Sequence, residues 1–88
     1  MLFRSLGESL RGQRQTAAAA EAYESVLTFP RTEPELRRKA TLAAGEMYDL
    51  LQKRDLAVAR YNAVIAVQPD SDQADVARKH LREPYRLP

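Results

Sequence analysis

Few side chains in this sequence could carry out catalysis or hold a metal ion. His80 is the only histidine and cysteine is absent, which excludes disulfides, thiol catalysis and cysteine-based metal sites. No second histidine or carboxylate pair stands beside His80 at the spacing of a metal site. We therefore expect His80 to be a solvated residue on the exposed side of a terminal helix. No serine has a base partner that would activate its hydroxyl as a nucleophile.

Two further patterns match ligand sites only in part. Asp70 and Asp72 could suggest calcium, but the rest of an EF-hand loop is missing, and both residues suit the start of a helix. The three glycines are scattered and do not form a phosphate-binding loop. The sequence therefore predicts no metal ion, no cofactor and no enzymatic activity.

Charge and length narrow the classes of partner. The chain has 88 residues, 14 basic and 12 acidic side chains and a net charge of +2, which is too even to indicate nucleic acid or an anionic membrane. No apolar run could span a bilayer, and residues 1–6 are too short for a secretory signal. The basic run Arg37–Lys39 could contact an acidic peptide, but pairing with Glu33 and Glu35 on a solvated helix face is the favoured interpretation.

Apolar residues recur at helical spacing in the middle of the chain. The first stripe contains Leu36, Ala40, Ala43, Met47 and Leu51, and the second contains Ala57, Tyr61, Val64 and Ile65. Gly45 and Ala57 are small, so two antiparallel helices can approach closely where these residues lie, and Tyr61 fills the adjoining space. Residues 52–55 form the predicted turn, and Pro69 ends the second helix.

These positions match a known repeat. The match comprises Gly45, Tyr48, Ala57, Tyr61, Val64 and Pro69, which follow the small, aromatic and helix-ending positions of the tetratricopeptide repeat. The segment closely resembles that family, and the resemblance implies an all-α solenoid of antiparallel helix-turn-helix repeats. We expect repeat two at about 33–69, with Thr32 and Glu35 as a capping box.

An earlier unit repeats part of the pattern. Gly7 stands 38 residues before Gly45, and Ala19, Tyr23 and Val26 stand 38 residues before Ala57, Tyr61 and Val64. Repeat one is therefore expected at about 1–30, with a first helix ending at Gly12 and a second starting at Thr16. A capping helix at about 71–83 follows, ended by Pro84, and Tyr85 is expected to fold back onto repeat two. The prediction is five helices, or two repeats and a cap.

The resemblance also implies where a partner would bind. The concave face of such a stack is formed by the first helix of each repeat, which here contributes Lys39, Leu42, Glu46 and Asp49 from repeat two and Arg4, Glu8 and Arg11 from repeat one. Leu42 and Glu46 replace residues with which the family grips a C-terminal carboxylate, so that particular site is not expected. The mixed charges suit an extended or helical peptide.

The leading functional hypothesis is therefore a non-catalytic module for protein–protein interaction. The alternative is a C-terminal helical extension of a larger bacterial protein, either an enzyme or an envelope-assembly factor, of which this chain is a fragment. It rests on the resemblance of residues 45–49 and 77–81 to the tails of bacterial tetratricopeptide proteins. Self-association through the N-terminal end is a further expectation, and RNA binding is the weakest hypothesis. The compartment stays open between cytoplasm and periplasm.

Overall fold

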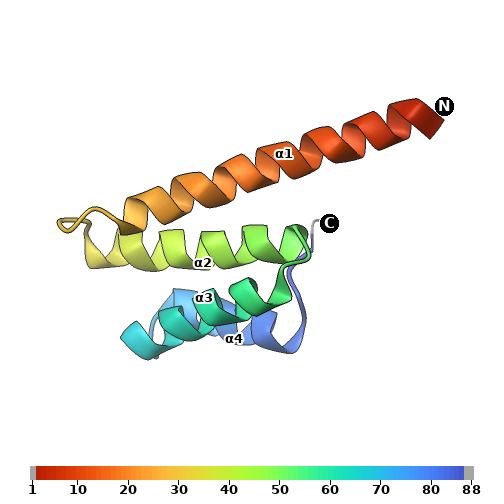
Figure 1. The fold of residues 1–88 in the computed structure, drawn as a ribbon. Helices are drawn as coiled ribbons and strands as arrows, with labels where there is room; N and C mark the ends of the chain where they lie inside the picture. The colour runs from red at the N-terminus through yellow and green to blue at the C-terminus, as the bar shows by residue number, and fades with distance from the viewer. Residues whose placement is uncertain (1, 87–88) are drawn as a thin grey trace.

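The structure, a computed structural model, describes residues 2–86 of the backbone and the side chains from Gly12 onward. Within these residues the chain is all-helical and consists of α1 (Leu2–Leu27), α2 (Pro34–Leu50), α3 (Arg54–Val67) and α4 (Asp72–Arg82). Each helix runs antiparallel to the one before it and packs on it (Figure 1). No helix in the described part is long and apolar enough to cross a membrane.

The α2–α3 hairpin closes through the small residues that the sequence singles out. Gly45 lies against Tyr61, and a Cβ atom added at Gly45 would stand 2.7 Å from a ring carbon of Tyr61. Ala44, Ala57 and Tyr61 are fully buried. The predicted antiparallel pair is therefore confirmed, and the absence of a side chain at Gly45 is what lets the tyrosine ring lie across the seam.

The turn between α2 and α3 has a defined geometry. Gln52 adopts φ 60°, the left-handed conformation that glycine enters most easily. The amide of Lys53 donates to the carbonyl of Tyr48 at 2.8 Å, and the amide of Gln52 donates to that of Asp49 at 3.0 Å. This is the Schellman arrangement, which satisfies carbonyls left open at the end of a helix. A turn between the two helices is confirmed, but it comprises residues 51–53, and Arg54 and Asp55 of the predicted turn belong to α3.

α4 forms where the sequence predicts a final helix, at about 71–83, and packs against α3 and α2. The Ser71 side chain accepts a hydrogen bond from the amide of Ala74 at 3.1 Å, which caps the first turn. Ala74 and Ala77 are fully buried and join one core cluster with Ala57, Tyr61 and Val64. The hydrophobic core of the described residues therefore lies between α3, α4 and the inner face of α2.

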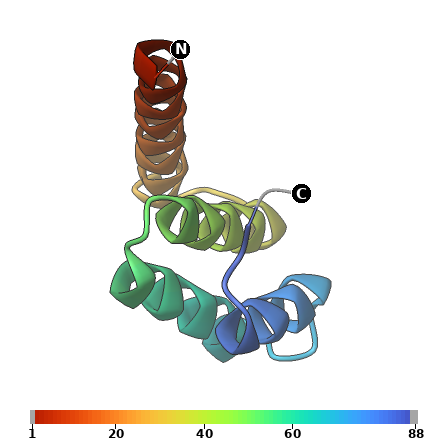
Figure 2. The same cartoon turned by 90° about the vertical axis from the view of Figure 1, so that its right-hand side faces the viewer.

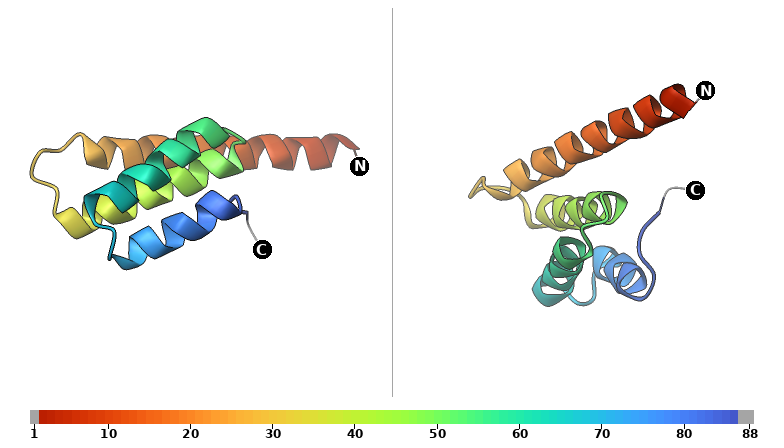
Figure 3. Two further views of the ribbon diagram at one scale, coloured as in Figure 1. Left: turned by 90° about the horizontal axis from the view of Figure 1, so that it is seen from below. Right: turned by 45° about the vertical axis from the view of Figure 1, so that its right-hand side comes forward.

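The first predicted hairpin does not form, because α1 is one helix of 26 residues. The expected break at Gly12 is wrong: the Thr16 hydroxyl does not cap a new helix but donates to the carbonyl of Gly12 at 2.8 Å, within the helix. Alanine has the highest helix propensity of any residue type, so the alanine run at 17–20 continues the helix. The N-terminal turns of α1 consequently extend past the end of α2 (Figures 1 and 3).

The start of α2 also differs from the prediction. Glu33 is the N-cap and makes no side-chain capping bond. Thr32 instead donates to the carbonyls of Val26 and Phe29, so the expected capping box is wrong and the threonine closes the end of α1.

Two of the predicted ion pairs on this part of the chain have different outcomes. Arg37 donates to the carbonyls of Leu27 and Phe29, which are acceptors at the end of α1. Glu35 and Lys39 do pair as predicted, with 3.4 Å between Lys39 Nζ and Glu35 Oε1. On α4, Asp75 pairs with Arg78 at 3.0 Å, whereas its i,i+4 spacing predicts a pair with Lys79. Exposed pairs of this kind contribute only about 0.3–0.5 kcal/mol each.

Candidate functional site

The structure gathers six polar and aromatic residues where α2, α3, α4 and the segment after α4 meet. We call this group the polar cluster: Glu46, Asp49, Arg54, Tyr61, His80 and Tyr85. α2 supplies the two carboxylates, α3 supplies the arginine and the first tyrosine, and α4 with the following segment supplies the rest. Glu46 and Asp49 lie three residues apart and so share one face of α2.

Asp49 is the centre of the polar cluster. Its side chain is 2% exposed, and its oxygens accept hydrogen bonds from Arg54 Nη1 at 3.0 Å, from the Tyr61 hydroxyl at 2.6 Å and from the Tyr85 amide at 3.1 Å. Burying a carboxylate is costly unless it has a charged partner and hydrogen bonds for its oxygens. Asp49 has both, so its buried carboxylate is paired with a charge and its oxygens are hydrogen-bonded.

Arg54 connects the cluster to α4. While its Nη1 faces Asp49, its Nη2 donates to the carbonyls of His80 and Leu81, at 2.9 Å each. These carbonyls belong to the last turn of α4, where no helical amide follows to bond them. One guanidinium therefore joins the end of α2, the start of α3 and the end of α4.

The environment of Tyr61 favours its neutral form. Burial raises the pKa of the Tyr61 hydroxyl well above its usual value of 10, and the hydrogen bond to Asp49 raises it further. Tyr61 therefore serves as a hydrogen-bond donor over the whole physiological range of pH. This arrangement orients Asp49.

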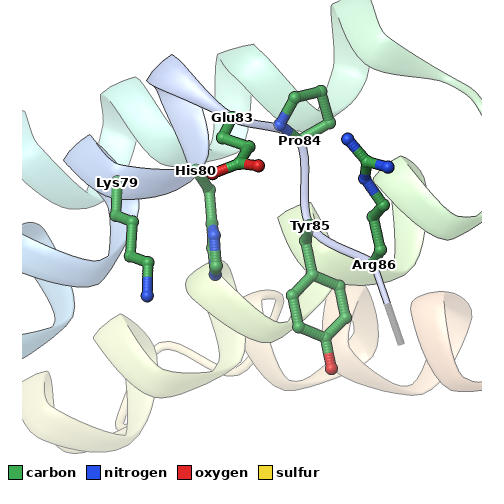
Figure 4. Close-up of a pocket in the computed structure, with 6 residues that line it drawn as sticks. All are labelled: Lys79, His80, Glu83, Pro84, Tyr85 and Arg86. Carbon is green, nitrogen blue, oxygen red and sulfur yellow. The ribbon is translucent and has the colours of Figure 1, made fainter. Parts of the chain in front are cut away.

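His80 is not the solvated residue that the sequence predicts. Its side chain is 12% exposed, and Nε2 lies 3.0 Å from Glu46 Oε2. A carboxylate can only accept a hydrogen bond, so Nε2 carries the proton in this pair. The imidazole also stands between two aromatic rings, with centroids 5.4 Å away at Tyr61 and 5.2 Å away at Tyr85. Its orientation beside Tyr85 is visible in Figure 4.

Sequence reasoning missed His80 because its contacts come from three other segments. Glu46 lies 34 residues away, and no local pattern relates the two. A weak signal was present: His80 follows the buried Ala77 by three residues, which places it on the inner face of α4. The expectation that Tyr85 folds back is confirmed by its contacts with Asp49 and His80.

The predicted partner-binding residues are placed as follows. Lys39 is exposed, Leu42 packs against the core cluster, and Glu46 and Asp49 belong to the polar cluster. The side chains of Arg4, Glu8 and Arg11 lie outside the part that the structure describes. The structure thus brings Glu46 and Asp49 together with α4, and their use in peptide binding stays a prediction.

An open hollow of about 460 Å³ lies beside the polar cluster. Its lining consists of Lys79, His80, Glu83, Pro84, Tyr85 and Arg86 (Figure 4). The hollow has an aromatic surface with positively and negatively charged side chains around it. Such a surface suits a polypeptide better than a small ion. In the described residues, no three His, Cys, Asp or Glu side chains are grouped so that they could hold a metal ion.

A second hollow, of about 300 Å³, lies where the start of α2 meets the end of α3. Its residues include Pro34, Thr41, Ala63, Val64 and Val67, and Val67 is 73% exposed. This hollow is mainly apolar and lies at the opposite end of the hairpin from the polar cluster.

Comparison of the chain with protein-family models, curated proteins and solved structures gave no match.

Proposed function

We propose that this chain is a non-catalytic helical-repeat module that binds another protein. The observation that carries the proposal is the α2–α3 hairpin, in which Gly45 admits the ring of Tyr61 and α4 packs alongside as a third helix. A tetratricopeptide-like unit uses the same spacing of small and aromatic residues to stack its helices. Proteins built from stacked helix pairs commonly present an extended face to a partner.

The hydrogen bonds and ion pairs within the polar cluster support a non-catalytic role. Asp49 holds Arg54 and Tyr61, and Glu46 holds His80. A catalytic acid or base must face the substrate to which it gives a proton or from which it takes one. Here each such group is engaged in joining one helix to another, so a stabilising function accounts for the cluster.

The proposed partner surface is the face of α2 beside α4. Lys39 contributes an exposed positive charge there, and Glu46, which is bonded to His80, contributes a carboxylate side chain that is 22% exposed. Arg38 reaches Gln73 of α4 at 3.4 Å and links the two helices that border the face. An extended or helical peptide carrying both signs of charge would complement this surface.

A selection experiment tests the proposal. Random peptides displayed on phage are selected against the full chain, and the enriched peptides are measured against Lys39→Glu and against Lys53→Glu. Lys53 is a matched control because it is also exposed but lies in the turn after α2. We expect Lys39→Glu to weaken binding about tenfold, or about 1.4 kcal/mol, and Lys53→Glu to change it little. No enrichment, or equal losses in both variants, would overturn the proposal.

A further inference from the structure

The segment after α4 lies against the proposed partner surface. Beyond Arg82 the chain leaves the helix and runs back from α4 toward α2 (Figure 2). Residues 83–86, which we call the tail, border the hollow beside the polar cluster (Figure 4). The tail therefore covers the end of the α2 face that bears Asp49.

The tail makes contacts of the kind that a bound extended peptide makes. The Tyr85 amide donates to Asp49 Oδ2 at 3.1 Å, and the Tyr85 ring meets the His80 ring edge-on, with centroids 5.2 Å apart. A backbone amide outside a helix must find an acceptor elsewhere, and here the acceptor is a side chain of α2. Extended peptides are commonly bound through main-chain hydrogen bonds together with side-chain contacts.

The backbone at the start of the tail has an extended conformation that suits this position. Glu83 has φ −140° and ψ 115°, an extended conformation, and Pro84 restricts Glu83 to that region. Pro84 cannot continue α4 and has no amide to satisfy. The tail thus leaves α4 through an extended residue, and little further ordering is needed for Tyr85 to meet its two partners.

From these contacts we propose that the α2 face beside α4 binds an extended peptide with an aromatic side chain, and that the tail occupies this place as a displaceable intramolecular competitor. The aromatic side chain of the partner takes the position of Tyr85 beside His80, and a main-chain amide of the partner takes the bond to Asp49. This inference rests on the proposed function and adds the class of ligand and its regulation.

The strength of the competition follows from tethering. A segment joined to its site by a short linker acts at an effective concentration in the millimolar range. A free peptide with only the contacts of the tail must therefore approach millimolar concentration to displace it. A partner that also contacts Lys39, further along α2, gains affinity that the tail lacks and can open the site at lower concentration.

The test uses the full chain and a synthetic probe. The probe is the acetylated and amidated tetrapeptide with the sequence of residues 83–86, and its binding is followed by NMR chemical shifts of the His80 ring. We expect Tyr85→Ala to bind the probe at least tenfold more tightly than the unmodified chain. Tyr85→Phe keeps the ring and should resemble the unmodified chain, and a probe with alanine in place of tyrosine should not bind.

Equal binding by the unmodified chain and Tyr85→Ala, or binding that does not require the aromatic residue of the probe, would overturn the inference. If Tyr85→Ala does not fold, the unmodified chain still decides the matter, because millimolar probe must shift the Tyr85 amide resonance as the tail is displaced. An unmoved amide at saturating probe would also overturn it. The hydrogen bond and the ring contact of Tyr85 involve Asp49 and His80 and not Lys39, so selected peptides that require Lys39 would support the proposed function even if Tyr85→Ala changed nothing, and the two proposals fail separately.

Discussion

Two stretches of this chain share one pattern of residues and fold differently. Gly45, Ala57 and Tyr61 build the α2–α3 hairpin, in which Tyr61 is fully buried. The equivalent Tyr23, 38 residues earlier, is only half-buried and lies on the continuous helix α1. A shared spacing of small and aromatic residues is therefore not sufficient to make a hairpin.

The difference between the two stretches lies in what closes the turn. In the hairpin, Asp49 and Arg54 lie on either side of the turn and bond each other. The residues at the equivalent places, 38 positions earlier, are Arg11 and Thr16, which cannot form such a pair. Thr16 bonds within α1 instead. The hairpin therefore has an ion pair across its turn that the first stretch lacks.

The largest expected contrast comes from placing a charge at the two equivalent alanines. Ala57→Arg should unfold the chain, because Ala57 is 0% exposed and the charge would have no partner. Ala19→Arg should cost less than about 1 kcal/mol, because Ala19 is only half-buried and a long side chain can reach solvent. Circular dichroism and thermal melting measure both, and similar melting curves would refute the assigned helix contacts.

The next contrast concerns two arginines on α3. Arg54→Ala should cost about 3 kcal/mol, because it leaves the buried Asp49 without its charged partner and removes two bonds to α4. Arg60→Ala should cost less than about 1 kcal/mol, because its pair with Glu24 of α1, at 2.7 Å, is about one-third exposed. Urea denaturation measures both losses. Equal losses would show that the polar cluster does not close the hairpin.

The two glycines with described surroundings should respond in opposite directions to alanine. Gly45→Ala should destabilise the chain by about 1–3 kcal/mol, because the new methyl group meets the Tyr61 ring. Gly12→Ala should stabilise it by about 0.5–1 kcal/mol, because nothing lies within 4 Å and alanine favours helix. Chemical denaturation of the two variants decides the point, and a loss on Gly12→Ala would indicate a bend in α1.

The smallest effect is a dependence of stability on alkaline pH. The pKa of Tyr61 is raised in the folded chain, first by burial and then by Asp49. Above about pH 10 the unfolded tyrosine ionises and the folded one does not, so stability is present below pH 10 and falls as pH rises further. Tyr61→Phe should be less stable at pH 7 but lose less between pH 9 and 11. Parallel losses in the two proteins would contradict this assignment.

The helices themselves were largely predictable from local pattern. Apolar spacing located α2 and α3, and Pro69 marked the end of the hairpin. Asp70, Ser71 and Asp72 were all candidate caps for the last helix, and the structure shows that Ser71 caps α4. Each of these signals acts within a few residues through side-chain periodicity or capping. The error at Gly12 arose because glycine can end a helix but does not require it to end, and the alanines that follow favour continuation.

The candidate site was predictable only in fragments. Glu46 and Asp49 were selected as partner-binding residues, and Tyr85 was expected to fold back, but their common meeting point was not foreseen. The hydrogen-bonded pairs that attach α4 and the tail to the rest of the polar cluster join residues 26 to 36 positions apart, such as Arg54 with the His80 carbonyl and Tyr85 with Asp49. No sequence window holds both members of such a pair.

By itself the sequence determined that this chain would be helical, where most of its helices lie and which small residues allow close packing, because these properties follow from propensity and periodicity over short spans. Tertiary structure alone decided that one stretch would close into a hairpin, that the other would continue as α1, and that His80 would be enclosed. The physical reason is that a buried carboxylate is stable only when donors from several helices converge on it, and that convergence exists only in the folded chain.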